Sequence, residues 1–398
     1  IPFTITRALI QLHSVPFALT LDQGIGYAPL QSVSETSSAE VRHALDSLRA
    51  EGMEKLILDL RGNPGGALDQ GIAITDYFLE PGQVVVETRG RAPNQSEVFS
   101  AYDVEPYADL SVVVLVDEAS ASASEIIAGA LQDHDRGVVV GAPTFGKGSV
   151  QTLFPLTGGN ILRLTTARWY TPVGRSIHKD REDQIAAMER SALTLSGFLA
   201  TLPDTTPKPV FHTRGGREVL GGGGITPDVL VMADTLTTLE RGAITELDRS
   251  GGSFVTTLFN FVVGYLQYHP NLQPDFVLTQ ADLDDFHRAL DEADVILSDA
   301  AYARVERFIR YQLEREIALQ KWGEAGQFLR TLSYDRIIQR ALSLLDQADT
   351  PQGLLEVAAE PDFSDWQPRI VEEVETEDSS AEVAGEASDT EQGEGSGS

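Results

Sequence analysis

The sequence predicts an α/β protein with a mainly parallel central sheet, followed by a C-terminal all-α domain and a disordered acidic tail. In the first 180 residues, short apolar runs alternate with stretches of helical spacing, which is typical of a parallel sheet. From residue 236 to residue 348, apolar residues recur only at helical spacing, as in Phe308, Ile309 and Leu313. The last residues are rich in Glu, Ser and Gly.

The apolar runs of the first part predict the strands of the sheet. Ser111–Val116 is continuous and apolar, which indicates a strand buried on both faces. The other predicted strands are Ile25–Leu30, Lys55–Leu60, Val84–Thr88, Val138–Val140, Val150–Phe154 and Ile161–Thr166.

Helical spacing predicts the connections between these strands. Helices are expected over Ser38–Glu51, Leu68–Phe78 and Glu125–Leu131. Residues 181–206 have the pattern of a helical insertion. Thr279, with an acidic residue three positions later, resembles a capping box at a helix start.

These patterns divide residues 11–398 into three expected parts. We assign residues 11–235 to the α/β core, 236–348 to a helical accessory domain and 349–398 to a linker and disordered tail. Residues 371–398 contain ten acidic residues and neither Lys nor Arg, and cannot bury enough apolar surface to fold. The chain begins at Ile1, and its first residues alternate like a strand, so we expect an upstream part that would carry any export signal.

Composition excludes several classes of function. The formal net charge of −30 argues against nucleic acid as a partner, because phosphates are met by Lys and Arg. The chain has no Cys, which removes disulfides, thiol catalysis and Cys-ligated metals. No apolar run reaches the roughly 18 residues that a membrane-spanning helix needs.

A serine-rich turn follows the predicted strand Ser111–Val116. Small residues from Ala119 to Ser124 can present a hydroxyl and exposed N–H groups at a helix N-terminus, where developing negative charge is favoured. Because Ser is also a preferred N-cap, this run by itself is more typical of ordinary helix capping than of a catalytic turn.

A glycine turn follows another predicted strand, at Arg61–Gly66. Gly65 and Gly66 allow a sharp bend that directs N–H groups inward. Alone, this is an ordinary strand-to-helix turn. Together with the serine turn it lies at the carboxyl ends of parallel strands, where α/β sheets place their ligands.

A third loop contains a lysine that allows two interpretations. Gly141–Gly146 followed by Lys147 nearly matches a nucleotide-binding loop, but Gly148 stands where a magnesium-binding hydroxyl is required. Residues 149–154 then continue as a strand, not a helix. The alternative is a general base, since a desolvated lysine can accept the proton of a serine hydroxyl.

Histidine gives no competing base or metal site. No HExxH motif or paired spacing is present, so we expect no metal and no cofactor. His134 is expected at a helix end facing solvent. The remaining histidines are isolated or lie in polar stretches, at positions 13, 43, 178, 212, 269 and 287.

The three loops, in this order, resemble the C-terminal processing (tail-specific) serine peptidases. The similarity covers residues 3–180 and resumes at Gly221–Val229. The matching pieces are Ile25–Tyr27, Ile57–Gly66, Ser120–Glu125, Ala128–Leu131, Thr144–Gly148, Gln151 and Tyr170–Ile177.

The resemblance implies a crotonase-like core and a Ser/Lys dyad that cleaves proteins near their C-termini by acyl transfer. Ser122 is then the nucleophile, Lys147 the general base, and Gln151 the residue that positions the lysine. The N–H of Ala123 and one N–H from Gly65 or Gly66 would form the oxyanion hole. The choice between the two glycines stays open.

The resemblance also leaves differences. Family members usually carry a PDZ domain before the core, of which residues 1–10 would be the remnant. The resemblance implies protein or peptide substrates and a bacterial envelope location, periplasmic or exported. The helical domain is a candidate surface for homo-oligomer formation. The alternative function is a non-catalytic peptide-binding homologue of the same fold.

Overall fold

The computed structural model describes residue 7 and residues 12–92, 95–104, 106–201, 207–248, 253–295 and 297–360. The expected PDZ remnant, apart from Arg7, and the expected acidic tail therefore lie outside the described residues.

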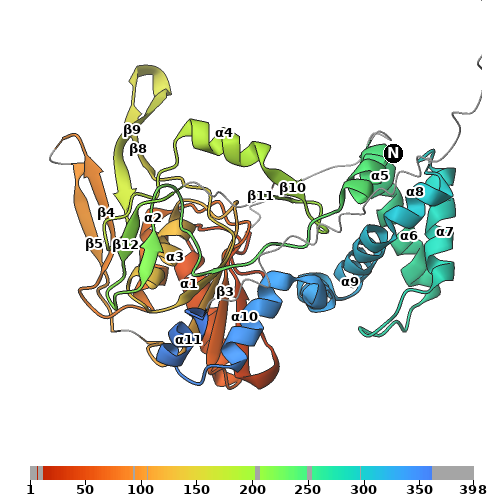
Figure 1. The fold of residues 1–398 in the computed structure, drawn as a ribbon, viewed down its shortest axis with the longest axis horizontal. Helices are drawn as coiled ribbons and strands as arrows, with labels where there is room; N and C mark the ends of the chain where they lie inside the picture. The colour runs from red at the N-terminus through yellow and green to blue at the C-terminus, as the bar shows by residue number, and fades with distance from the viewer. Residues whose placement is uncertain are drawn as a thin grey trace, which may run out of the picture.

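The centre of the protein is a six-stranded sheet, and it confirms the predicted parallel arrangement (Figure 1). All neighbours pair in parallel except the first strand, which is antiparallel to the second. The strand order across the sheet is β1 (Leu19–Thr20), β2 (Ile25–Pro29), β3 (Lys55–Asp59), β6 (Ser111–Val116), β7 (Val138–Gly141) and β14 (Val229–Leu230).

Both faces of this sheet are buried, as the continuous apolar strands predict. Side chains alternate between two separate hydrophobic clusters. Leu56 and Leu58 point to one cluster, whereas Ile57, between them, belongs to the other. The same alternation occurs along β6, where all six residues are buried.

One face of the sheet is covered by three helices and a second sheet. The helices are α1 (Ser37–Ala50), α2 (Leu68–Asp76) and α3 (Ala123–Asp133). The second sheet is antiparallel, in the order β5 (Glu97–Ser100), β4 (Val84–Gly90), β9 (Ile161–Tyr170) and β8 (Ser149–Pro155). All strands and helices predicted between Ile25 and Thr166 are present, and β1 and β5 are additions.

The other face is covered by α10 (Arg336–Asp346) and α11 (Pro351–Ala358), the last two helices among the described residues, shown in blue in Figure 1. This corrects the predicted division, which placed 236–348 in an accessory domain and 349–398 in a linker and tail. Leu344 and Leu354 are buried against the sheet. Apolar periodicity predicts that a helix has a buried side, but not which layer it covers.

The helices between β14 and α10 form a separate arm with its own hydrophobic cluster. They are α5 (Thr238–Asp248), α6 (Ser253–Tyr268), α7 (Gln280–Glu292), α8 (Asp299–Arg304) and α9 (Glu306–Thr331). The predicted capping box at α7 is confirmed: Thr279 N–H donates to Asp282, and the Asp282 N–H donates to Thr279 Oγ1.

Helix α9 joins the arm to the core and is interrupted at Gly323, where φ is 71° and ψ is −167°. A conformation with positive φ is accessible to glycine at low cost, so the helix can change direction there. Beyond this point Phe328 stacks on Tyr27 of the sheet, with ring centroids 3.9 Å apart.

The predicted helical insertion at 181–206 is helical only in its first part. It contains α4 (Arg181–Glu189) and a hairpin of β10 (Ser191–Leu193) and β11 (Leu199–Thr201); residues 202–206 lie outside the description. A further hairpin pairs β12 (Val210–His212) with β13 (Glu218–Leu220). Short 3₁₀ turns occupy Asp22–Gly24, Thr157–Gly159 and Leu332–Tyr334.

Among the residues described, no helix combines the length and the apolar character needed to cross a membrane.

Candidate active site

Three loops meet at one edge of the central sheet. They follow β3, β6 and β7, which are direct neighbours and run parallel, so their carboxyl ends lie side by side. The loops contain Gly65 and Gly66, Ser122, and Lys147 respectively. The structure thus places all three predicted loops at the edge where α/β sheets bind ligands.

Ser122 occupies a strained turn between β6 and α3. Its φ of 58° and ψ of −114° lie in a region that non-glycine residues rarely adopt, and such a conformation costs about 1–3 kcal/mol. The residue is half-buried at the N-cap position of α3. A serine on a sharp strand-to-helix turn resembles the turn that exposes the nucleophile in α/β-hydrolases.

The two neighbouring serines have structural partners instead. Ser120 and Ser124 are fully buried. The hydroxyl of Ser120 donates to the carbonyl of Leu60, and that of Ser124 donates to the carbonyl of Asn63. Both therefore tie the serine turn to the glycine turn. Neither of them is the N-cap of α3, because that position is occupied by Ser122 itself.

The glycine turn packs directly against the serine turn. Gly65 has a φ of 81°, and a Cβ atom built on it would lie 2.4 Å from the Ala121 oxygen and 2.8 Å from the Ser122 Cβ. No side chain fits at that distance, so glycine is required here. Asn63 organises the turn: it is fully buried and its Nδ2 donates to the carbonyl of Leu30.

The main-chain donors of these two turns differ in their availability. The N–H of Gly65 donates to Oδ1 of Asn63 at 2.8 Å. Within the described part of the chain, neither the N–H of Gly66 nor that of Ala123 has an acceptor. The free N–H of Ala123 is the first of the helix, so it also has the favourable end of the helix dipole.

Glu125 connects the serine turn to the lysine loop. Its carboxylate is fully buried and accepts four hydrogen bonds. Oε2 accepts from the N–H groups of Ser122 (2.8 Å) and Lys147 (2.9 Å). Oε1 accepts from the N–H of Gly146 (2.8 Å) and the hydroxyl of Thr144 (2.6 Å). Burial raises the pKa of Glu125, and these hydrogen bonds oppose the rise.

The importance of Glu125 was missed in the sequence. It stands three residues after Ser122, so the pair has the S-x-x-E spacing of a capping box, in which the Glu accepts the N–H of the N-cap residue. That signal predicts the bond to Ser122. The bonds to the lysine loop depend on tertiary structure and have no local signal.

The side chains of Lys147 and Gln151 are both exposed. This departs from the dry pocket that a neutral lysine base requires. In the described residues no hydrogen bond joins Nζ of Lys147 to Oγ of Ser122, and Gln151 does not contact either of them through a hydrogen bond. The structure therefore brings the main chains of the predicted dyad together but leaves the lysine side chain in solvent.

The glycine turn is also linked to the C-terminal helices. Arg61 forms a bidentate pair with Asp59 and an ion pair with Asp335, the N-cap of α10. Tyr27 donates its hydroxyl to the same Asp59 carboxylate at 2.7 Å. This buried cluster lies directly under the start of the glycine turn.

His134 differs from its prediction. It caps the C-terminal end of α3 but is half-buried, and its Nε2 lies 2.7 Å from the carbonyl of Val84. Burial lowers its pKa, and the hydrogen bond to Val84 opposes this. Over the ranges that the structure describes, no group of three or more His, Asp or Glu residues is placed to hold a metal ion.

Two cavities flank the loops at this edge. One, of about 660 Å³, lies beneath α4 and is walled by Thr144 and Phe145 of the lysine loop. The other, of about 800 Å³, lies between the sheet edge and α9 and includes Arg61. Glu118, just before the serine turn, lines both cavities.

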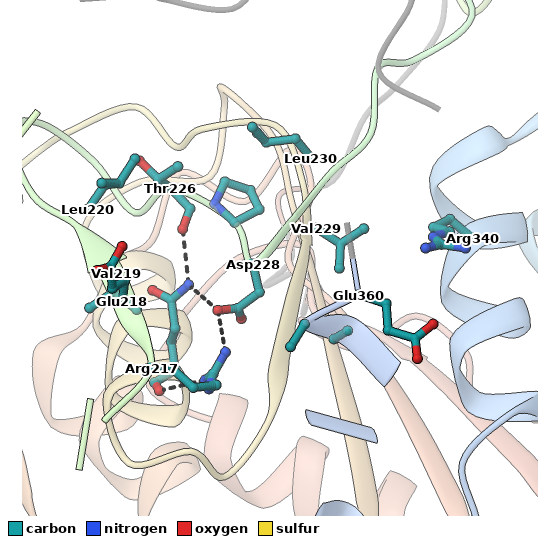
Figure 2. Close-up of a pocket in the computed structure, with 14 residues that line it drawn as sticks. Arg217, Glu218, Val219, Leu220, Thr226, Asp228, Val229, Leu230, Arg340 and Glu360 are labelled. Atoms are coloured by element: carbon teal, nitrogen blue, oxygen red, sulfur yellow. Dashed lines mark hydrogen bonds and ion pairs between the residues drawn. The ribbon is translucent and has the colours of Figure 1, made fainter. Parts of the chain in front are cut away.

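A third cavity, of about 670 Å³, lies far from the serine turn (Figure 2). Gln132, in its wall, and Ser122 are at opposite ends of α3, about 15 Å apart along the helix. Figure 2 shows Arg217 reaching the carboxylate of Asp228. Nη1 of Arg217 lies 2.7 Å from Oδ1 of Asp228, and Oδ2 of Asp228 accepts the N–H of Val139. These contacts hold β14 against β7, so we assign this region a structural role.

Comparison with known proteins gives one family. Residues 24–186 match the family model described as "Peptidase family S41". A carboxy-terminal-processing protease of Bartonella bacilliformis is 43% identical over 177 residues, which cover 44% of this chain and 40% of that protein. A carboxyl-terminal-processing protease of Synechocystis is 46% identical over 182 residues, covering 44% and 42%.

Among solved structures, a photosystem II D1 C-terminal processing protease is similar with 32% sequence identity. The match covers 42% of this chain and 44% of that chain, with a TM-score of 0.36. The chain therefore spans less than half the length of the curated relatives named above. The helical arm, α10 and α11 lie outside the segment matched to the family.

Proposed function

We propose that this chain, which is related to peptidase family S41 over residues 24–186, is a serine endopeptidase that cleaves proteins near their C-termini. The observation that carries the proposal is the carboxylate of Glu125, which holds the strained turn of Ser122 and the loop of Lys147 against each other. A helix cap alone requires neither the strain nor the lysine loop.

In this proposal Ser122 is the nucleophile and Lys147 the general base. Their main-chain nitrogens bond to the same oxygen atom, so they lie within about 6 Å of each other. A lysine side chain is long enough to span that distance and reach the serine hydroxyl. Gln151, on the strand that follows, would position the lysine. The rotation of an exposed side chain over the serine would bring Lys147 into the site and exclude water there.

The oxyanion hole would be formed by the N–H groups of Ala123 and Gly66. Two observations support Gly66 over Gly65: the N–H of Gly65 is already bonded to Asn63, whereas that of Gly66 has no acceptor in the described structure. Two N–H groups aimed at one point stabilise the negative charge that forms on the carbonyl oxygen during acyl transfer.

The acyl transfer would proceed in two steps. Lys147 accepts the proton of Ser122 as Oγ attacks the scissile carbonyl, and then gives this proton to the departing amine. Lys147 next accepts a proton from water as the water attacks the acyl ester, and gives this proton to Oγ of Ser122 as the ester bond breaks, which releases the second product and restores the serine. The core that carries these groups is proposed to be crotonase-like, and the reaction to need no cofactor.

Protein or peptide segments are the proposed substrates, and a bacterial cell envelope the proposed location, since the relatives named above are bacterial processing proteases. Neither the net charge nor the loops support nucleic acid as a partner.

A homo-oligomer through the helical arm is also proposed. Helix α6 contains no charged residue, and Val255, Phe259 and Val263 follow one another at helical spacing on its exposed side. Val255 and Phe259 are 67% and 51% exposed. An uncharged apolar stripe of this kind is typical of a surface that a second protein covers. Phe259→Asp is expected to reduce the molecular mass measured by sedimentation, with Thr256→Asp as the control on the same helix.

The experiment for the peptidase proposal is labelling with a fluorophosphonate. We expect the probe to label wild-type protein at Ser122, Ser122→Ala to abolish labelling and proteolysis, and Ser124→Ala to retain both. Glu125→Gln should lower the labelling rate at least tenfold, because the amide cannot accept all four hydrogen bonds. Labelling of another serine would refute the assignment. A protein that binds peptide but is never labelled would be the non-catalytic homologue.

A further inference from the structure

Strand β8 leads directly out of the loop that holds Lys147. It begins at Ser149, two residues later, and forms with β9 a two-stranded ribbon that projects from the second sheet (Figure 1). β8 is the last strand of that sheet. In the described part of the protein β9 is its only pairing partner, so one edge of β8 is open.

The register of the ribbon shows which groups face the open edge. The N–H of Leu156 donates to the carbonyl of Asn160 at 2.8 Å, which makes this a hydrogen-bonded pair. In an antiparallel ladder such pairs alternate with non-bonded ones. Gln151 and Leu153 are in the non-bonded positions, opposite Thr165 and Arg163, and therefore direct their N–H and C=O groups outward.

The ribbon lacks the usual protection of an exposed edge. Natural proteins place charges on open strands to prevent pairing with other chains. Although 23% of this chain is charged, Arg163 is the only charged residue between Ser149 and Thr165. The ribbon instead exposes apolar side chains, which are Leu153 (60% exposed), Phe154 (39%), Leu156 (49%), Ile161 (63%), Leu162 (41%) and Leu164 (46%).

We propose that the open edge of β8 binds the main chain of the substrate, in an inference that rests on the proposed peptidase function. An extended, apolar segment of the substrate adds as a further strand beside Gln151 and Leu153, and the chain beyond it passes Lys147 to place its scissile bond at Ser122. This edge would recognise a substrate segment by its extended conformation and its lack of charged residues. It would not require one particular side chain in the substrate.

Two features favour this occupant over a second copy of the chain. The edge is continuous with the proposed active site, because β8 begins two residues after Lys147. The edge also ends at Pro155, which has no N–H, so the open ladder is short enough for one peptide segment. Apolar side chains at alternate positions of the added peptide can pack against the exposed apolar side chains of the ribbon.

Binding is best measured separately from catalysis, on the Ser122→Ala protein. The probe is a fluorescein-labelled peptide of about ten residues, a strand of ordinary length, with Val and Thr alternating. Fluorescence anisotropy gives its affinity. Methylation of single peptide nitrogens is expected to weaken binding at every second position, because only alternate N–H groups of an added strand face β8.

A matched pair of proline variants tests the edge itself. Leu153→Pro removes an outward N–H of β8 while leaving the hydrogen bonds to β9. Ile161→Pro removes an outward N–H of the opposite edge, on β9. We expect Leu153→Pro to weaken peptide binding by about three- to tenfold, the value of one hydrogen bond, and Ile161→Pro to leave it unchanged. Melting temperature and circular dichroism check that both variants are folded.

The outcomes separate this inference from the proposed function. Equal effects of the two prolines, or no alternation in the methylation series, would overturn the binding edge even if Ser122 is labelled normally. Alternating binding in a protein that is never labelled would support the edge and refute the peptidase. A change in sedimentation with Leu153→Pro, without a change in peptide affinity, would show that the edge pairs copies of the chain.

Discussion

Arg61 forms an ion pair with Asp335, which lies 274 positions later in the chain, with Nη1 and Oδ2 2.7 Å apart. Arg61 begins the glycine turn of the proposed site, and Asp335 begins α10. The side chains are 19% and 27% exposed. The contact thus connects the last layer of the fold with the loop expected to stabilise the reaction's negative charge.

Replacing Asp335 is expected to weaken both stability and activity. Asp335→Asn keeps a good N-cap but removes the charge, and should cost about 1–2 kcal/mol in the free energy of unfolding. Asp335→Ala loses the cap as well and should cost more. Urea unfolding measures the stability, and the fluorophosphonate labelling rate measures the site. If Asp335→Asn and wild type have the same free energy of unfolding and the same labelling rate, the ion pair contributes to neither stability nor activity.

Substituting the glycine turn tests its close approach to the serine turn. Gly65→Ala should abolish labelling of Ser122, because the new Cβ would lie 2.4 Å from the Ala121 oxygen. Gly62→Ala is the control, since it also has a positive φ (70°) but open space around it. The control should lose roughly 1 kcal/mol of stability through strain alone and keep its labelling. Equal labelling of both variants would contradict the packing argument.

A pH dependence of stability is expected from Glu118. Burial, with a smaller effect of Asp117, raises its pKa from the ordinary value of 4.5 to about 7. Between these values the folded protein binds more protons than the unfolded chain, so the free energy of unfolding falls as pH rises.

Glu118→Gln removes this titration. Its melting temperature should therefore decrease less than that of wild type between pH 4.5 and pH 7, and the two should run parallel above pH 8. If the difference in melting temperature between Glu118→Gln and wild type stays constant from pH 4.5 to pH 7, Glu118 does not titrate as its burial implies.

The general base can be tested by charge-conserving substitution. Lys147→Arg should be inactive, because a guanidinium stays protonated at any workable pH and cannot accept the proton of Ser122. A lysine that acted only as a fixed cation would tolerate arginine. Hydrolysis of a peptide substrate by both proteins is compared over pH 6–10, with a chelator control that should have no effect. Substantial activity of the Arg protein would rule out the dyad.

Much of the α/β part could be predicted because its signals are local. Ser111–Val116 reads as a doubly buried strand, and the structure buries every residue of it. The serine, glycine and lysine loops could be placed at one edge because parallel strands share their carboxyl ends. By contrast, the exposure of Lys147 depends on what packs above its loop, and nothing in residues 141–148 encodes that.

The C-terminal layer was not predictable for a related reason. The spacing of Ile337, Ile338 and Leu345 shows a buried helix side but is equally compatible with packing inside the arm. Only tertiary structure shows that the chain leaves the sheet after β14, builds the arm, and returns to cover the remaining face. The role of Glu125 in joining two loops could not be predicted either, because its bonds to the lysine loop depend on tertiary structure.

This return of the chain affects how the protein is made. During synthesis β14 leaves the ribosome about a hundred residues before α10, a delay of roughly 5–20 s at about 5–20 residues per second. Throughout that interval the face with Ile57 and Val113 has no cover from α10 and α11. A nascent chain in this state exposes an apolar surface and is therefore prone to aggregate. A product cut short before α10 should aggregate or be degraded, because this face of the sheet then stays uncovered.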